Sequence, residues 1–281
     1  MSGHTTAAAS LEKLLQIMAM LRDPSHGCPW DLQQTFASIA PHTLEEVYEV
    51  IDAIETDDGK QLQSELGDLL FQIVFYAQLG KEQRLFDFAA IAEAMSTKLL
   101  QRHPHVFPDA SLASFGKREE LSSDQVVANW EQIKAEERRQ KQAAEHPSML
   151  DDVPHALPAV LRAAKLQKRA ANVGFDWPEV NPVILKIREE LSELEDAIRK
   201  ADSRNIEEEF GDLLFTMVNL SRHLAVNPET SLRQANRKFE NRFRYIESTL
   251  KKSGVEMTDL SQDELDKYWI KAKQAENEND V

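Results

Sequence analysis

One acidic pattern occurs twice in this chain of 281 residues, and it limits the possible folds more than any other feature. In each copy, two glutamates three positions apart precede a glutamate and an aspartate three positions apart. The first copy consists of Glu46, Glu49, Glu65 and Asp68, and the second of Glu190, Glu193, Glu209 and Asp212. Each residue of the second copy lies 144 positions after its counterpart (190−46, 193−49, 209−65 and 212−68). Carboxylates three positions apart share one face of a helix, so two adjacent helices of this kind would gather four carboxylates.

The rest of the sequence favours a duplicated, all-α architecture. Long segments are rich in Ala, Leu, Glu, Lys and Gln, only 9 Gly are present, and we find no strand pattern. We predict helices at residues 11–21, 43–56, 60–79, 87–102 and 124–143, and again at 158–171, 182–200, 204–225, 229–252 and 261–275. The sequence therefore predicts a tandem repeat of two helical-bundle domains, residues 11–143 and 159–275, joined by a linker at 144–158.

Local signals predict several helix boundaries. Asn181 and Pro182 are typical of an N-cap followed by the first helical residue. Residues 27–30 (GCPW) are expected to form a loop, and residues 108–123 a longer connection. The 87–102 helix should end at His103-Pro104.

Composition narrows the class of protein. The net charge of −15 argues against a nucleic-acid surface but leaves a small nucleotide open as a substrate. Cys28 is the single cysteine and cannot form an internal disulfide. No apolar run reaches the roughly 18 residues that a membrane span needs. We expect no membrane partner and a cytoplasmic location.

The acidic pairs also have ordinary structural explanations. In a chain with 29% charged residues, such pairs are often solvated helix faces. Thr43 and Glu46 also fit a capping box. That explanation fails for Glu190, because Ile187 stands at the position that corresponds to Thr43.

Asp68 and Asp212 favour a functional interpretation. Each follows a glycine, Gly67 or Gly211, and precedes an apolar run, so we expect both aspartates to be at least partly buried. A glycine inside a helix costs roughly 1 kcal/mol relative to alanine, which suggests close approach by a metal or ligand. The alternative is that each aspartate pairs with a nearby Lys or Arg.

The ligand types indicate the metal. All the candidate ligands are carboxylates, and no histidine lies three residues after any of them, as a di-iron bundle would require. Oxygen-only ligation suits Mg²⁺, with Mn²⁺ as an alternative. His103 and His105 are expected to end a helix rather than bind a metal.

These motifs resemble those of the two-domain bacterial MazG proteins, which belong to the all-α nucleoside triphosphate pyrophosphohydrolases. HTLEEVYEVIDAI, ELGDLLFQIVFYAQ and QRHPHVFPD resemble the first half of that family, and KLQKRAANVGFDW, EEFGDLLFTMVNLSRHL and ANRKFENRFRYIE its second half. The resemblance implies Mg²⁺-dependent hydrolysis of nucleoside triphosphates to a monophosphate and pyrophosphate. It further implies broad base preference, a homodimer, and a role in cleaning the nucleotide pool or in the stress response.

The resemblance also assigns residues. It implies a metal site at Glu190, Glu193, Glu209 and Asp212. These four residues, together with Glu189, are the candidate catalytic residues. It implies substrate contact by Lys186, Glu190, Glu208, Asp212, Lys238, Arg242, Trp269 and Lys273. A second, weaker site would consist of Glu46, Glu49, Glu65 and Asp68, with Lys98, Arg102, Trp130 and Lys134.

Several roles stay open at this stage. Either Glu189 or Glu193 could position or deprotonate the attacking water. Lys238 and Arg242, four residues apart, could bind phosphate or simply form a solvated face. Trp269 could stack on the base or pack in the core.

The two halves are not equivalent. Lys186 and Arg188 correspond to His42 and Leu44, so the first half lacks two cations beside its acidic helix. We therefore expect the second half to be the principal catalytic domain, with the first weaker, specialised or structural. A nucleotide-binding regulatory or dimerisation module without turnover is the alternative.

Overall fold

The computed structural model describes residues 6–116, 121–141 and 148–279, and these residues form helices and connecting loops with no strand. The chain divides into two compact units at residue 142. The first contains α1 (Ala7–Leu21), α2 (Pro29–Gln33), α3 (Phe36–Glu55), α4 (Gly59–Glu82), α5 (Phe88–Arg102) and α6 (Ser123–Lys141). The second contains α7 (Ala159–Ala171), α8 (Val180–Lys200), α9 (Ser203–His223), α10 (Pro228–Ser253) and α11 (Gln262–Asn279). The all-α prediction is confirmed.

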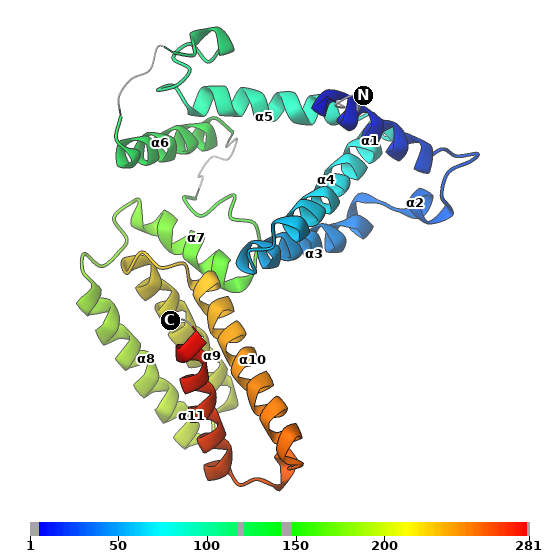
Figure 1. The fold of residues 1–281 in the computed structure, drawn as a ribbon. Coiled ribbons are helices and arrows are strands. Elements are labelled where there is room, and N and C mark those ends of the chain that lie inside the picture. Colours follow the sequence, from blue (N-terminus) through cyan, green and yellow to red (C-terminus); the bar gives the residue numbers. More distant parts are fainter. Residues whose placement is uncertain (1–5, 117–120, 142–147, 280–281) are drawn as a thin grey trace. The chain divides into compact units, whose positions relative to one another are not determined.

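Each unit is built around one helical hairpin (Figure 1). In the first unit α3 packs along α4, and in the second α8 packs along α9. The second helix of each hairpin begins at an aspartate N-cap, Asp58 or Asp202, whose carboxylate accepts backbone N–H bonds from the first helical turn. These caps also lie 144 residues apart, so the two hairpins begin their second helices at equivalent positions.

The two units place their buried cores differently. In the first unit the core lies between α1, α3 and α4, and contains Met18, Ile39, Val74, Phe75 and Leu79. In the second unit the described core cluster lies between α10 and α11, and contains Ile246, Leu250 and Ala272. Helices α8 and α9 also bury apolar side chains, among them Val183 and Ala197, and the α7–α8–α9 region contains a pocket.

Helices α1 and α3 begin earlier than predicted, at Ala7 and Phe36, and two of the local boundary signals are wrong. Residues 29–33 form the short helix α2. Pro29 occupies its first position, where a backbone N–H would have no partner within the helix, so the missing N–H of proline costs nothing. Helix α8 begins at Val180 with Glu179 as its N-cap, so Asn181 lies inside the first turn. By contrast, α10 begins with an Asn227 N-cap followed by Pro228, the arrangement that was expected at 181–182.

The capping-box explanation for Thr43 and Glu46 is also wrong. Helix α3 begins earlier, with Thr35 as its N-cap and Ser38 completing a capping box. Thr43 is therefore a mid-helix residue, and its hydroxyl contacts the Ile39 carbonyl and the Tyr76 hydroxyl.

Parts of three predictions fall outside the described residues. These are residues 117–120 of the predicted connection, residues 142–143 of the predicted helix, and residues 144–147 of the predicted linker. Of the helices that the structure does describe, none has a stretch long and apolar enough to span a membrane.

Candidate active site in the second unit

Helices α8 and α9 bring three glutamates together. Glu190 and Glu193 lie one turn apart on α8, and Glu209 lies on α9. One carboxylate oxygen from each falls within 4.8 Å of the other two. Glu190 is buried, whereas Glu193 is exposed. The arrangement provides three oxygen donors at a distance suitable for one cation.

The first unit repeats this cluster. Glu46 and Glu49 on α3 and Glu65 on α4 meet the same distance condition. The duplicated sequence pattern thus becomes a duplicated carboxylate cluster, with one in each hairpin. The shared geometry follows from equal helix spacing and equivalent caps.

Both clusters bring like negative charges close together. Burial and the charges of Glu193, Glu190, Asp212 and Glu208 raise the pKa of Glu209. Burial and the charges of Glu65, Glu46 and Glu45 raise the pKa of Glu49 in the same way. Like charges held close together oppose ionisation, and a bound cation would relieve that repulsion.

The two aspartates are placed differently from the sequence prediction. Asp68 and Asp212 are exposed rather than partly buried, and neither belongs to the three-glutamate clusters. The predicted burial is wrong because the apolar residues beside them also face solvent in the single chain; Leu70 and Leu214 are 37% and 53% exposed. Asp212 nevertheless borders a pocket together with Glu190. Among the described residues neither aspartate forms an ion pair, which removes the pairing alternative.

The glycines that precede these aspartates are not required by packing within the chain. A β-carbon built at Gly67 or Gly211 would meet no protein atom within 4 Å. No described protein segment approaches either glycine, so the space beside each one is open to a ligand.

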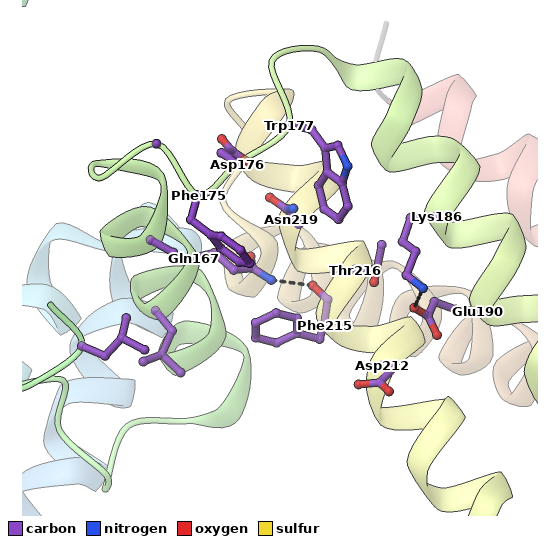
Figure 2. A pocket seen from close by; sticks show the side chains of 14 residues that line it. Gln167, Phe175, Asp176, Trp177, Lys186, Glu190, Asp212, Phe215, Thr216 and Asn219 are labelled. Atoms are coloured by element: carbon purple, nitrogen blue, oxygen red, sulfur yellow. Dashed lines mark hydrogen bonds and ion pairs between the residues drawn. The ribbon is translucent and has the colours of Figure 1, made fainter. Parts of the chain in front are cut away.

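Lys186 provides positive charge to the second cluster. Its Nζ lies 2.8 Å from Oε1 of Glu190 (Figure 2). It also lies 3.0 Å from Oε1 of Glu189. These hydrogen bonds raise the pKa of Lys186, so it stays protonated at neutral pH. In the first unit the equivalent His42 is 3.7 Å from Glu45. Arg188, the other predicted cation, is exposed and has no ion pair among the described residues.

A pocket of about 760 Å³ adjoins the second cluster. It is lined by Leu150, Leu166, Gln167, Ala170, Gly174, Phe175, Asp176, Trp177, Lys186, Glu190, Asp212, Phe215, Thr216 and Asn219. Figure 2 shows that α7, the loop before α8, α8 itself and α9 all contribute side chains. The pocket thus continues from the acidic cluster into a partly aromatic space.

Sequence reasoning did not identify the polar side chains of this pocket. No role was predicted for Gln167 or Asn219, and Asp176 and Trp177 appeared only at the end of the KLQKRAANVGFDW motif. Asp176 Oδ1 accepts hydrogen bonds from Arg222 at 2.5 Å and lies 3.3 Å from Nε2 of His223. Burial by itself would raise the pKa of Asp176, but these partners outweigh it and lower the pKa. The network fixes the loop before α8 against the end of α9.

Arg242 and Trp269, two of the predicted substrate contacts, meet between α10 and α11. Arg242 pairs with Glu276 at 2.7 Å and lies over the ring of Trp269, 5.4 Å from its centroid. Trp269 packs against the α10–α11 core, in agreement with the core-packing alternative. Lys238, Lys273 and Glu208 are exposed. None of these five predicted residues lines the pocket.

The first unit contains the same arrangement. Arg102 pairs with Glu137 at 2.6 Å, and Lys134 lies 3.5 Å from the centroid of the Trp130 ring. Lys98 is exposed. Both halves therefore contain an arginine–glutamate pair and a tryptophan under a cation, but that cation is Lys134 in the first unit and Arg242 in the second.

Comparisons with known proteins agree with the duplicated architecture. A family model described as the MazG nucleotide pyrophosphohydrolase domain matches residues 34–107 and 180–246, and each segment contains one acidic cluster. A nucleoside triphosphate pyrophosphohydrolase from Escherichia coli (strain K12) is 52% identical over 95% of this chain and 98% of its own length. The nucleoside triphosphate pyrophosphohydrolase/pyrophosphatase MazG of Thermotoga maritima is 42% identical over 95% of this chain and 97% of its own length. A crystal structure of a mazG-related protein from Thermotoga maritima aligns with a TM-score of 0.36, at 23% identity, over 44% of this chain and 98% of that chain.

Proposed function

The chain belongs to the MazG family of nucleotide pyrophosphohydrolases, and on that basis we propose that it hydrolyses nucleoside triphosphates to a nucleoside monophosphate and pyrophosphate. We locate the reaction at the carboxylate cluster of α8 and α9. In this reaction water adds to the α-phosphorus, and the bond from that phosphorus to the bridging oxygen of the β-phosphate breaks. Family membership and a 52% identical relative of this activity support the proposal.

The donor set fits a hard divalent cation. Three carboxylate oxygens within 4.8 Å of one another offer oxygen-only ligation, and burial together with the neighbouring carboxylates raises the pKa of Glu209. We propose that Glu190, Glu193 and Glu209 hold Mg²⁺, with Asp212 as the fourth ligand. When bound, the ion neutralises phosphate charge and favours in-line displacement.

Lys186, Glu189 and Glu193 have distinct proposed roles. Lys186 borders the pocket beside Glu190, where its ammonium group can contact a phosphate oxygen. Glu189 is tied to Lys186, whereas Glu193 is exposed within the cluster. We therefore assign the orientation of the attacking water to Glu193 rather than to Glu189.

Arg242 and Lys238 stay proposed phosphate contacts on the family resemblance. In this structure the Arg242 guanidinium is held by Glu276 and supported by Trp269, so substrate would exchange one anionic partner for another. Lys238 is exposed one turn earlier on the same helix. Lys273 stays a proposed nucleotide contact on the same resemblance.

The second unit is the proposed principal site. It combines the carboxylate cluster with Lys186 and an adjacent pocket, whereas the first unit has His42 at the equivalent position. The first unit keeps its glutamates, and we assign it a weaker or structural role.

A homodimer is proposed from a duplicated apolar stripe. Phe210, Leu214 and Met217 are 53%, 53% and 48% exposed on α9, at the spacing of one helix face. Their counterparts 144 residues earlier, Leu66, Leu70 and Ile73, are 49%, 37% and 39% exposed on α4. Exposed apolar stripes of this kind are typical of helix–helix interfaces.

The acidic cluster beside the Lys186-lined pocket is the observation that carries the proposal. The test is incubation of the purified chain with ATP and Mg²⁺, followed by identification of products. AMP and pyrophosphate are expected. ADP and phosphate, or binding without any product, would contradict the proposed reaction. The broad base preference and the role in nucleotide-pool cleaning are tested with a panel of standard and non-standard triphosphates.

A further inference from the structure

Two buried amide side chains line the pocket beside the acidic cluster. Gln167 comes from α7 and Asn219 from α9, and they are only 7% and 8% exposed. Buried amides are normally hydrogen-bonded through both the oxygen and the nitrogen. Each of these amides has one atom engaged by the protein, and the other requires explanation.

The orientation of Gln167 is fixed by its partner. Its Nε2 lies 2.7 Å from the backbone carbonyl oxygen of Phe215, which can only accept a hydrogen bond. Oε1 of Gln167 is thus the second atom, and it is buried with no hydrogen-bond partner. A buried acceptor without a partner costs free energy, and a hydrogen-bond donor on a molecule bound in the pocket would remove that cost.

The orientation of Asn219 is fixed in the opposite sense. Its Oδ1 accepts from the guanidinium of Arg222 at 2.8 Å, and a guanidinium can only donate. Arg222 is in turn anchored by Asp176. Nδ2 of Asn219 has no acceptor among the described residues, so the second amide offers a donor.

Flat apolar surface accompanies this donor and acceptor. Phe175, Trp177 and Phe215 line the same pocket; Figure 2 shows the rings of Phe175 and Phe215 between α7 and α9, and that of Trp177 on the side of α8. Lys186, Glu190 and Asp212 lie at its other side. One pocket therefore joins a planar, hydrogen-bonding compartment to the charged cluster assigned to phosphate and metal.

We propose that the Gln167–Asn219 compartment binds the nucleobase of the triphosphate, with Gln167 Oε1 accepting from the base and Asn219 Nδ2 donating to it. This inference rests on the proposed function for the position of the phosphates. A base supplies a planar ring for the aromatic side chains and an edge with both donors and acceptors. Each of the four common bases carries both a hydrogen-bond donor and an acceptor. The compartment can therefore bind any of these bases, which agrees with broad base preference.

The first unit has no equivalent compartment among its described residues. The counterpart of Asn219 is Phe75, which is fully buried in the core with Met18 and Ile39. Phe71 packs edge-on against Phe75 where the second unit has Phe215. The site that would receive a base is thus filled by protein, which separates the two carboxylate clusters in function.

Three triphosphates test the inference in the unmodified protein. Purine riboside triphosphate keeps the ring but has no N–H donor on its base, whereas inosine triphosphate has an N–H donor at N1. We expect kcat/KM for purine riboside triphosphate to be at least about tenfold below that for ATP, because Gln167 Oε1 is then unpaired. Inosine triphosphate should recover most of the loss. Equal kcat/KM for all three would overturn the inference.

Asn219→Asp tests the second contact. The aspartate keeps an oxygen for Arg222 but replaces the donor Nδ2 with an acceptor. We expect kcat/KM for ATP to fall at least about tenfold, while kcat/KM for ribose 5-triphosphate, which has no base, stays within about twofold. Asn236→Asp, on the exposed face of α10, is the matched charge control.

The outcomes separate this inference from the proposed function. If the unmodified protein releases no pyrophosphate from ATP, the proposed function fails. If pyrophosphate is released but Asn219→Asp lowers turnover of ATP and ribose 5-triphosphate equally, or of neither, the nucleobase compartment is refuted. If Asn219→Asp does not fold, the comparison of the three triphosphates decides alone.

Discussion

The ammonium group of Lys186 lies 2.8 Å from a carboxylate oxygen of Glu190, four residues later on α8, and both side chains line one pocket. Glu190 is 5% exposed, so its charge has little solvent to stabilise it. Among the described residues that line the pocket, Lys186 is the one cation. Lys186 is thus the counter-ion of a buried carboxylate and can also contact an anionic substrate in the pocket.

Replacement of Lys186 by methionine should lower kcat/KM for ATP by about 10- to 100-fold, because a charged phosphate contact is lost. The thermal midpoint of the metal-free protein should also fall, since the buried Glu190 loses its cationic partner, and Mg²⁺ should restore part of the loss. Steady-state kinetics and thermal unfolding measure both effects. His42→Met, at the equivalent position of the first unit, is the control. An equal effect of the two substitutions would contradict the assignment.

Arg242→Ala should raise KM for ATP by about tenfold, because a bidentate phosphate contact disappears. Arg102→Ala removes the equivalent guanidinium from the first unit and should leave KM unchanged. Substrate-saturation curves at fixed Mg²⁺ measure the effect. An unchanged KM in Arg242→Ala would assign this arginine only to the ion pair with Glu276.

The repulsion at Glu209 predicts a pH-dependent stability difference. Its raised pKa means that the ionised carboxylate destabilises the folded, metal-free protein. Glu209→Gln should therefore unfold at a higher temperature than the unmodified protein at neutral pH without metal. That advantage should shrink as the pH falls through the raised pKa, because Glu209 then becomes protonated. Mg²⁺ should stabilise the unmodified protein more than Glu209→Gln. Identical pH profiles for the two proteins would refute the prediction.

The exposed α9 stripe predicts the oligomeric state. The unmodified protein should have the mass of a dimer in light scattering, and Leu214→Glu should shift it towards a monomer by placing a charge in the apolar interface. Leu232→Glu is a matched control, because Leu232 on α10 is also 53% exposed but lies outside the stripe. A monomer in the unmodified protein, or equal effects of both substitutions, would exclude this interface.

The helices and the acidic clusters could be predicted from sequence because each depends on local periodicity. Spacing of three within a helix fixes which carboxylates share a face, and the 144-residue repeat shows that the same hairpin is built twice. Burial of Asp68 and Asp212 could not be predicted in this way. It depends on what covers the apolar side of α4 and α9. Periodicity predicts which residues share a helix face, but not which segment packs against that face.

The pocket could not be predicted because it depends on packing between distant segments. Gln167 and Phe215 are 48 residues apart and meet only because α7 packs on α9. The exchange of Phe75 for Asn219 between the repeats was visible at the offset of 144. Its consequence depends on the tertiary structure, in which Phe75 fills the core of the first unit and Asn219 lines the pocket of the second.

Pyrophosphate release from ATP by Glu209→Gln and Glu65→Gln, measured side by side with Mg²⁺, tests most directly where the reaction occurs. These substitutions remove equivalent carboxylates from the two clusters without changing side-chain size. Glu209→Gln should lose most of the activity, and Glu65→Gln should keep most of it. Loss of activity in Glu65→Gln with retention in Glu209→Gln would contradict the assignment of catalysis to the α8–α9 site.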